Sequence, residues 1–259
     1  MIHKPRLIAI TIIKNESKNY LRAWLKNMSR FVDFHIFLDD ASTDETPDIL
    51  QKAINSGYAG ILHRRDTSLF AENEPKLRAE LWAYTRQMAH NNDWILIVDA
   101  DEFYNERLLK FKRRLNRFNQ AGFTHCKVSC LDMWDKNHFR TDGFWSPMNA
   151  DIRLIAYRDV PFGQNNTHLH QPCYPKTLTL DKPVEMFVPK FHMAYLKPSD
   201  RHKRYHFYKT YVSPSDSISY KHACSILDEK PTLQTLYTAK QRLFRILNPK
   251  TVPIFKDIK

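Results

Sequence analysis

The chain has 259 residues, of which 42% are hydrophobic and 13% aromatic, enough to bury a substantial core in one large domain. This composition excludes disordered, collagen-like and small disulfide-stabilised proteins. Forty Lys and Arg residues against 28 Asp and Glu residues give a formal net charge of +12. The surplus favours anionic partners such as nucleotides, phospholipid headgroups, nucleic acid or phosphorylated glycans, without choosing among them.

Membrane insertion and a cysteine framework are both disfavoured by the sequence. No run of about 18 apolar residues occurs, and the apolar stretch after Arg6 is too short and interrupted for a signal peptide. We therefore expect a cytoplasmic protein without a transmembrane span. The four cysteines are Cys126, Cys130, Cys173 and Cys224. They lack paired zinc-binding spacing, so we expect reduced, structural thiols.

The first half alternates β-branched runs with amphipathic helical stretches. Four strands are predicted, at Leu7 to Ile13, Phe34 to Leu38, Ala59 to Leu62 and Trp94 to Val98. A helix is predicted after each strand. The first is capped by Ser17, the second has Thr46 as N-cap and Pro47 as its first residue, the third covers Pro75 to His90 and the fourth covers Asn105 to Asn119. Repeated strand–helix units predict an α/β fold with a mostly parallel central sheet and helices on both faces.

Ligands of such sheets bind beyond the carboxyl ends of the strands. Three expected strand ends carry polar groups: Lys14-Asn15-Glu16, Asp39-Asp40 and Asp99-Ala100-Asp101-Glu102. We expect these three polar clusters to converge at one edge of the sheet.

The second half changes character near Phe123, where aromatic and His residues become dense. Strands are expected at Thr124 to Leu131, Asp151 to Arg158 and Met186 to Tyr195, joined by long loops rather than helices. A basic amphipathic helix is expected at about Thr232 to Ile246. The pattern predicts a mixed-strand extension of the sheet, not an independent domain.

The most informative motif is the pair Asp99 and Asp101 at the end of the run WILIV. Two carboxylates two residues apart, where a strand gives way to a turn, can reach one hard divalent cation such as Mg²⁺ or Mn²⁺. Such an ion can stabilise a diphosphate leaving group. The alternative is that Asp99 caps a helix and that Asp101 and Glu102 lie in its first turn. The position after a fully buried strand, opposite a second acidic turn, favours the metal site.

The second acidic turn runs from Asp39 to Thr46. A carboxylate at a strand end can accept hydrogen bonds from a base N–H or a ribose hydroxyl, while Ser and Thr hydroxyls order the loop. The alternative is an Asx or ST turn that leads into the helix at Pro47, and both interpretations can hold together.

Three segments, KNESKNYLRAWL, FLDDASTDET and WILIVDADEF, resemble in order and spacing the motifs of family 2 glycosyltransferases, over about residues 6 to 105. The resemblance implies a GT-A fold, also called the nucleotide-diphospho-sugar transferase fold, a UDP-sugar donor and a Mn²⁺ or Mg²⁺ cofactor. The residues that it implicates in donor binding are Thr11 and Glu16 in the nucleotide pocket, Asp39 at the uracil, Asp99 at the ribose or metal and Asp101 at the metal. Ser42, whose hydroxyl lies in the acidic turn, is a further candidate for donor binding.

The sequence departs from the family pattern at two places. Ala41 stands where the family usually has Gly, and no clear Arg-Asn pair occupies the helix before the Asp-x-Asp strand. Arg78 or Arg86 is expected to supply the positive charge for the diphosphate instead.

A downstream segment also carries a resemblance. FHMAY, followed by DRHKRY, resembles a region after the catalytic strands in a branch of these transferases. It implies that His192 is a third metal ligand, with a satisfied core or surface histidine as the alternative. Arg201, Lys203 and Arg204 are expected to clamp the diphosphate from a loop that orders when the donor binds, with a solvated basic face as the alternative.

An inverting displacement needs a base near the acceptor hydroxyl. The candidates are Asp132, Asp135, Asp142 and Asp151. Trp134 and Trp145 are candidates for stacking on a sugar or base, or for the core. The sequence has no Glu-Asp pair of the kind that many family 2 enzymes use.

Together these features predict a metal-dependent, inverting transfer of a sugar from a UDP-sugar to a hydroxyl group. The acceptor is expected to be a surface or lipid-linked glycan reached by peripheral contact at the inner membrane face. A phage-type enzyme acting on hydroxymethylated bases in DNA remains an alternative. So does a non-catalytic nucleotide or nucleic-acid binding module, against which the intact Asp99 and Asp101 argue.

A nucleotidyltransferase is disfavoured because a chain with only 5 Gly has no Gly-rich phosphate loop. We expect one catalytic domain. Its nucleotide-binding half covers residues 1–122, its acceptor-binding half covers 123–230, and a basic helix and tail cover 231–259.

Overall fold

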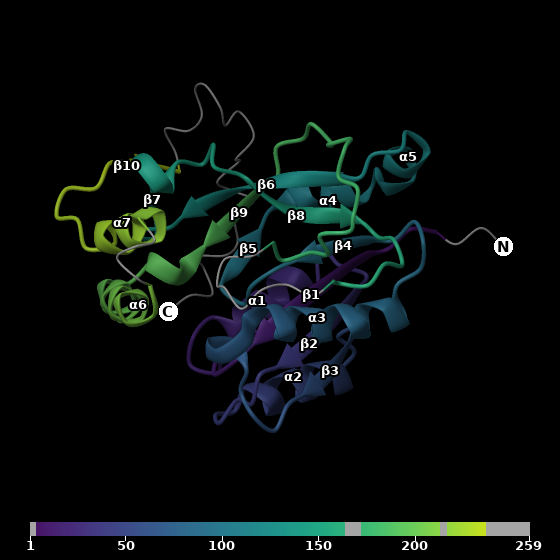
Figure 1. The fold of residues 1–259 in the computed structure, drawn as a ribbon, viewed down its shortest axis with the longest axis horizontal. Helices are drawn as coiled ribbons and strands as arrows, with labels where there is room; N and C mark the ends of the chain where they lie inside the picture. Colours follow the sequence, from purple (N-terminus) through teal and green to yellow (C-terminus); the bar gives the residue numbers. More distant parts are fainter. Residues whose placement is uncertain (1–3, 164–171, 213–216, 237–259) are drawn as a thin grey trace. The chain divides into compact units, whose positions relative to one another are not determined.

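The computed structural model describes residues 4–163, 172–212 and 217–236 (Figure 1). The chain divides into two compact units. The first unit comprises Met1–Val128 and Asp151–Val188, and the second comprises Ser129–Ala150 and Pro189–Lys259. Each unit has its own buried hydrophobic cluster.

The sheet of the first unit is built on four parallel strands. They are β1 (Leu7–Ile13), β2 (Phe34–Asp39), β3 (Gly60–Arg64) and β4 (Trp94–Ile97). Their order across the sheet is β3-β2-β1-β4 (Figure 1), so the predicted parallel neighbours are confirmed. Beyond β4 lies the antiparallel strand β8 (Asp151–Ala156), which pairs with the first half of β6 (His125–Asp132). The sheet is therefore mixed, as the α/β prediction with a mixed extension required.

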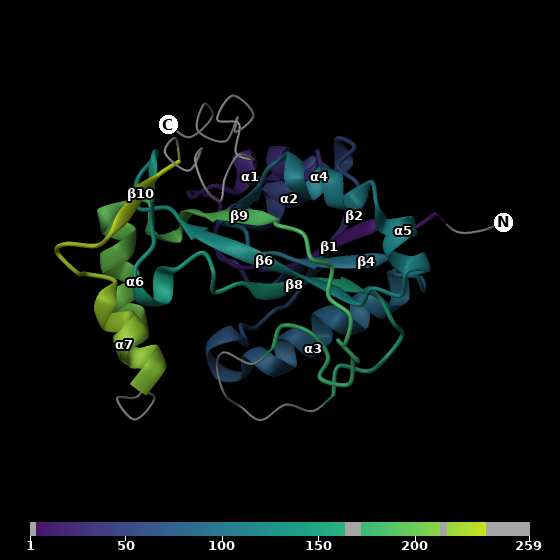
Figure 2. The same ribbon diagram turned by 90° about the horizontal axis from the view of Figure 1, so that it is seen from above.

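Helices cover both faces of this sheet. They are α1 (Leu21–Met28), α2 (Thr46–Asn55), α3 (Phe70–Met88), α4 (Glu106–Lys112) and α5 (Leu115–Gln120). Figure 2 shows α3 on one face and α1, α2 and α4 on the other. Six of the seven residues of β1 are buried, because this strand is covered on both sides. Within the described ranges, no helix combines the length and apolar character needed to cross a bilayer.

Several helix boundaries differ from the prediction. Helix α1 begins at Leu21, and the Ser17 hydroxyl donates to Asp44 at 2.6 Å instead of capping it. Thr46 lies within α2 and follows the N-cap residue Glu45. The helix expected over 105–119 is two short helices, α4 and α5. Both bury apolar side chains at helical spacing, so the apolar pattern continues across the break and resembles a single helix.

The second unit contains short strands and two helices. Strand β7 (His138–Arg140) pairs antiparallel with β10 (Leu233–Thr235), and β9 (Pro189–His192) pairs parallel with the second half of β6. Helices α6 (Pro198–Tyr211) and α7 (Ser217–Ser225) pack together. The buried cluster of this unit consists of Trp134, Trp145, Ala194, Tyr195 and Ile226.

Within the described residues, no α-helix joins β6, β8 and β9, as expected, but α6 and α7, which follow Tyr195, were not predicted. Polar and aromatic residues are mixed around α6, so no apolar stripe marked it as a helix. The strand expected from Met186 to Tyr195 is limited to β9 and is followed by a 3₁₀ turn over Met193–Tyr195. The helix expected from Thr232 is also corrected, since Leu233–Thr235 form β10, and its remainder from residue 237 lies outside the described residues.

A row of hydrogen-bonded side chains, formed by Tyr58, His35 and Thr11, crosses the core of the first unit. His35 Nδ1 lies 2.8 Å from the Tyr58 hydroxyl, and His35 Nε2 lies 2.9 Å from Thr11 Oγ1. The Thr11 hydroxyl donates to the carbonyl oxygen of Val98 at 2.8 Å, so it accepts from Nε2–H, and Tyr58 donates to Nδ1. Burial lowers the pKa of His35 to about 3, and the ring is neutral in the folded protein.

This buried imidazole predicts a loss of stability in acid. The folded-state pKa of His35, about 3, lies below the unfolded value of 6.5. Its stabilisation is therefore complete above pH 6.5 and is lost as the pH falls toward 3. We expect His35 to add a slope of up to about 1.4 kcal/mol per pH unit to the free energy of unfolding. Urea unfolding of wild type and His35→Gln between about pH 4 and 7 measures it. The exposed His202→Gln variant should keep the wild-type slope, and an equal slope in His35→Gln would contradict the prediction.

Candidate functional site

The carboxyl ends of β1, β2 and β4 lie at one edge of the first unit's sheet. The register pairs Ile13 with Asp39, so β1 and β2 end together, and it pairs Ile10 with Ile97, so β4 ends opposite Ile10, before the end of β1. The three polar strand ends expected from the sequence follow these strands. Sheets of this kind bind ligands at this edge, which is therefore the candidate site.

The loops after β1 and β2 are tied together by hydrogen bonds. The backbone N–H of Asn15 donates to Ser42 Oγ at 2.9 Å, and the N–H of Thr43 donates to Asn15 Oδ1 at 2.8 Å. The N–H of Glu16 donates to Thr46 Oγ1 at 2.7 Å. The two loops therefore form one ordered surface, as the Ser and Thr hydroxyls of the acidic turn predicted.

Asp39 anchors the turn that follows β2. Its side chain is fully buried and accepts hydrogen bonds from the backbone N–H and the hydroxyl of Ser42, while Arg64 Nε lies 3.5 Å away. The alternative for this loop, an Asx turn that leads into the helix, is found at Asp44, whose Oδ1 accepts a hydrogen bond from the N–H of Thr46 at 2.9 Å. The uracil contact of Asp39 stays a prediction. It requires that a lone pair of the Asp39 carboxylate be available to the base while the carboxylate also holds the turn.

Asp40 has a separate role. Its carboxylate accepts hydrogen bonds from the N–H groups of Leu69 at 2.7 Å and Phe70 at 3.1 Å, at the start of α3. The Ser68 hydroxyl donates to the same carboxylate at 2.6 Å. A carboxylate at a helix N-terminus satisfies backbone N–H groups that have no partner within the helix. The first turn of α3 therefore begins at Phe70. The helix is kinked at Asn73, whose backbone is not helical and whose side chain accepts a hydrogen bond from the N–H of Lys76 at 3.0 Å, so the second helical segment begins close to the expected Pro75.

Asp99 and Asp101 lie in the turn between β4 and β5 (Glu102–Tyr104). The helix-cap alternative is wrong, because a strand follows this turn and α4 is capped by Asn105. The Asp99 side chain is 45% exposed and Asp101 is half-buried. These two carboxylates are oxygen donors at a surface turn, a donor set suited to a hard divalent cation.

Arg153 is a residue of this site that the sequence analysis missed. From β8, its Nη1 lies 3.5 Å from Asp99 Oδ2 and its Nη2 lies 3.6 Å from Glu102 Oε1. Burial would lower the pKa of Arg153, but Glu102 and Asp99 outweigh burial and raise it well above its usual value. The available signal was an arginine inside the otherwise apolar run of the strand Asp151–Ala156.

The two arginines proposed for the diphosphate differ in their surroundings. Arg78 on α3 donates to Glu74 at 2.7 Å. Burial would lower the pKa of Arg78, but electrostatic interactions with Cys173, Glu74 and Asp99 outweigh burial and raise it. Arg86 is exposed and pairs with Asp159 at 2.6 Å. Of these two arginines, Arg78 therefore interacts electrostatically with Asp99 in the Asp-x-Asp turn.

Two further predicted residues have partners in the protein. The Thr11 hydroxyl is buried in the hydrogen-bonded chain with His35. The Glu16 carboxylate accepts a hydrogen bond from Asn19 at 2.9 Å. The roles of Thr11 and Glu16 in the nucleotide pocket stay predictions.

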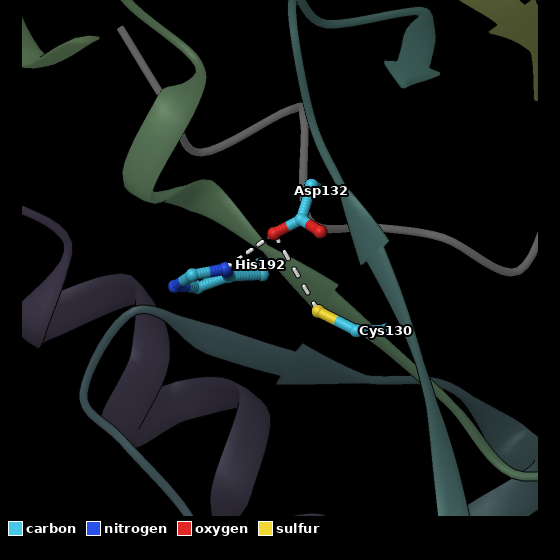
Figure 3. A group of neighbouring side chains, drawn as sticks. All are labelled: Cys130, Asp132 and His192. Carbon is cyan, nitrogen blue, oxygen red and sulfur yellow. Dashed lines mark hydrogen bonds and ion pairs between the residues drawn. The ribbon is translucent and has the colours of Figure 1, made fainter. Parts of the chain in front are cut away.

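In the second unit, the side chains of Cys130, Asp132 and His192 lie close together. His192 Nδ1 lies 2.7 Å from Asp132 Oδ1, and the Cys130 thiol lies 3.6 Å from the same oxygen (Figure 3). Among the residues that the structure describes, Cys130, Asp132 and His192 form a cluster whose ligand atoms lie within 4.8 Å of one another and could hold a metal ion. The predicted set of Asp99, Asp101 and His192 has members in both units and stays a prediction.

The other candidate bases are held in ion pairs or lie at the surface. Asp142 accepts two hydrogen bonds from Arg140, at 2.7 Å each, and these lower its pKa. Asp135 pairs with His138 at 2.8 Å; burial would raise its pKa, but hydrogen bonds from Asn137 and His138 outweigh burial. Asp151 is exposed.

Arg201 and Arg204 project from helix α6, not from the expected loop. Arg201 donates to the carbonyl oxygens of Trp134 at 2.9 Å and Tyr195 at 2.7 Å, and its guanidinium stacks over the Trp134 ring. Arg204 lies over the Tyr195 ring. Trp134 and Trp145 are 8% and 2% exposed, so both are core residues of the second unit.

A cavity of about 620 Å³ lies in the first unit near the amino end of β4. Its lining includes Asn91, Arg158, Asp159 and Thr177, and none of the predicted site residues. We place the candidate site at the carboxyl edge instead, because the loops and carboxylates gather there.

Structural comparison identifies the fold. A mannosyltransferase from Pyrobaculum calidifontis, PcManGT, solved with GDP-Man and Mn²⁺, matches with a TM-score of 0.50 over 98% of this chain and 73% of that chain, at 13% sequence identity. The chain has the GT-A fold. No protein-family model matches the sequence, and a search of curated proteins finds no relative of it. Membership of family 2 therefore stays a prediction.

Two further solved structures are less similar. Mannose-6-phosphate isomerase from Helicobacter pylori has a TM-score of 0.33 at 11% identity, over 60% of this chain and 62% of that chain. A 4-diphosphocytidyl-2C-methyl-D-erythritol synthase has a TM-score of 0.32 at 18% identity, over 59% of this chain and 76% of that chain. These scores are too low to support an argument about this GT-A chain.

Replacing Ala41 by Gly should stabilise the protein. Ala41 has a φ of +58°, a left-handed conformation that is unfavourable for residues with a Cβ atom. Relief of this strain exceeds the extra entropy that Gly gives the unfolded chain, so we expect a gain of about 0.5–1 kcal/mol in the free energy of unfolding. Chemical denaturation measures it. The control Ala53→Gly, inside α2, should lose about 1 kcal/mol. Equal losses in both variants would contradict the prediction.

Replacing Arg153 by Met should destabilise the first unit. The change leaves Glu102, which is 1% exposed, without its cationic neighbour. Removing one partner of a buried ion pair costs about 3 kcal/mol in unfolding free energy. Arg117→Met, an exposed change on α5, should stay within about 0.5 kcal/mol of wild type. A small effect at both positions would show that Glu102 does not depend on Arg153.

Proposed function

We propose that this GT-A chain is a glycosyltransferase that moves a sugar from a nucleotide-sugar donor to a hydroxyl group with the help of a divalent cation. The observation that carries the proposal is the placement of Asp99 and Asp101. Both lie in a partly exposed turn at the carboxyl edge of the parallel strands, beside the ordered loops after β1 and β2. This is the edge at which sheets of this kind bind ligands.

Asp99 and Asp101 are the proposed ligands of Mn²⁺ or Mg²⁺. When bound, such an ion neutralises the diphosphate leaving group. Arg78, whose charge interacts with Asp99, adds positive charge on the same side of the site. His192 is proposed as a nitrogen ligand on its sequence resemblance alone.

The donor is proposed to be a UDP-sugar, with Asp39 and Ser42 presenting the loop that receives the base. The mannosyltransferase of the same fold was solved with GDP-Man. A donor screen should therefore contain both uridine and guanosine diphosphate sugars.

In the proposed reaction, the acceptor oxygen forms a bond to the anomeric carbon as the bond to the diphosphate breaks, and a base takes the hydroxyl proton. Of the candidates Asp132, Asp142 and Asp151, we favour the exposed Asp151, because Asp132 pairs with His192 and Asp142 pairs with Arg140. A surface or lipid-linked glycan is the proposed acceptor, and the charge of +12 suits an anionic surface.

Asp101→Asn tests the metal site. We expect the variant to keep its fold and to lose metal affinity about tenfold or more, since loss of supporting residues alone costs about 10–100-fold. Thermal unfolding with each nucleotide sugar, with and without Mn²⁺, measures the effect, because a ligand that binds only the folded state raises the melting temperature. Asp159→Asn, at the other edge of the sheet, is the control and should behave as wild type.

Two results would contradict the proposal. One is a wild-type protein that no nucleotide sugar stabilises in the presence of Mn²⁺. The other is donor binding in Asp101→Asn that equals wild type. A steep salt dependence of duplex DNA binding would favour a DNA acceptor over a glycan.

A further inference from the structure

Helices α4 and α5 of the first unit carry a surplus of positive charge on their outer side. From Asn105 to Asn119 the chain has six Lys or Arg residues and a single acidic residue, Glu106. The inner side of both helices is apolar and buried, through Leu108, Phe111, Leu115 and Phe118. We use the name basic surface for one half-buried and four exposed side chains, which are Arg107, Lys110, Arg113, Arg114 and Arg117.

The spacing of these cations gathers them on one side of the two helices. Arg107, Lys110 and Arg114 are three, four and seven residues apart, a spacing that shares one helical face. The N–H of Arg113 donates to the carbonyl oxygen of Leu109 at 3.1 Å, so helical hydrogen bonding continues into the break between α4 and α5. Burial and, to a smaller extent, the charge of Arg114 lower the pKa of Arg107, as expected for two neighbouring guanidinium groups.

No carboxylate neutralises the basic surface. Among the residues that the structure describes, none of its five side chains has an ion pair or a hydrogen bond within the protein. Two acidic residues of this region pair with other cations: Glu106 pairs with Arg30 of α1, and Asp33 pairs with Lys112 at 2.7 Å. Positive charges gathered in this way produce a potential that attracts polyanions.

Helix α1 extends this region of positive charge. Arg22 and Lys26 are exposed and lie one turn apart on α1. The ion pair of Arg30 with Glu106 joins the end of α1 to the start of α4, and both helices lie on the face of the sheet opposite α3 (Figure 2). The cations therefore cover three neighbouring helices, which suits an extended anionic surface better than a small anionic ligand.

We propose that the basic surface binds the protein to a bilayer that contains anionic lipids. Such a bilayer attracts Lys and Arg side chains near its surface and requires no shaped pocket in the protein. The choice of a bilayer over another polyanion rests on the proposed function, whose acceptor is a surface or lipid-linked glycan. The positive charge of the surface does not depend on that function.

Nucleic acid is the alternative partner. Single strands are held by aromatic side chains on which the bases stack. The described residues of the first unit include no exposed Phe, Tyr or Trp ring, so they offer the bases no such platform. Duplex DNA, which requires phosphate contacts alone for non-specific binding, is compared directly in the experiment.

Co-sedimentation with phosphatidylcholine vesicles, prepared with and without phosphatidylserine, tests the proposal. We expect the full chain to bind only the vesicles that contain phosphatidylserine, and to be released as salt screens the charges. The double variant Lys110→Gln/Arg114→Gln should bind about 25-fold more weakly, because each cation near an anionic bilayer contributes about fivefold.

The chain offers a control with the same change of net charge. Lys76→Gln/Lys176→Gln alters two exposed residues at the other face of the sheet: Lys76 lies on α3, and Lys176 is close to Leu178, which packs against the same cluster as α3. This variant should bind vesicles as wild type does. All four positions are exposed, so both variants should keep the wild-type melting temperature.

Three results would overturn the proposal. The first is no binding of wild type to vesicles that contain phosphatidylserine. The second is an equal loss in both double variants, which would make net charge rather than the basic surface responsible. The third is tighter binding to duplex DNA than to these vesicles, with the DNA binding lost in Lys110→Gln/Arg114→Gln.

Vesicle binding and donor binding are measured separately, so the two proposals can fail independently. No residue of the basic surface belongs to the proposed donor site. If the vesicles bind through the basic surface but no nucleotide sugar raises the melting temperature with Mn²⁺, membrane binding stands and the proposed sugar transfer fails. If a nucleotide sugar binds but the vesicles do not, the reverse holds.

Discussion

The pairing of β1 with a parallel strand on each side is the constraint on which the candidate site depends. β1 is buried along nearly all of its length and hydrogen-bonds to β2 and β4 in fixed register. Because all three run the same way, their carboxyl ends meet at one edge, and the loops that follow must share that space. The loops satisfy their own backbone groups there, through Asn15, Ser42 and Thr43, and so present an ordered surface to a ligand.

Aspartates at this edge differ in role because their surroundings differ. Asp39 and Asp40 are fully buried, and each is surrounded by donors from the protein: the first orders a turn, and the second begins α3. Asp99 follows a strand that is just as buried, yet its side chain remains 45% exposed, with Arg153 at 3.5 Å. A buried carboxylate needs internal partners, whereas an exposed one can exchange water for a cation. Burial, rather than residue type, separates the structural carboxylates from the candidate metal ligands.

The sequence was most informative where local patterns and tertiary structure agree. The apolar run of β1 and the end of β4 predicted the parallel sheet and the position of the Asp-x-Asp turn, because a strand buried on both faces is apolar throughout. Helix α6 was missed because its polar and aromatic residues show no single apolar face. Arg153 and the partner of Asp40 depend on contacts between distant parts of the chain: Asp40 meets Leu69 and Phe70, and Arg153 meets Asp99 and Glu102. No local pattern encodes such pairs.

The surroundings of the carboxylates in the second unit determine how well each could act as the base in the proposed sugar transfer. Asp132, Asp135 and Asp142 each have a cationic or imidazole partner, and each has a pKa below its usual value. A group with a lowered pKa is a weaker proton acceptor, and efficient general bases have pKa values near the working pH. These three residues are therefore better suited to orienting or anchoring their partners than to removing a proton. On the β6–β9 pair, the contact of 2.7 Å between Asp132 and His192 is such an anchoring interaction.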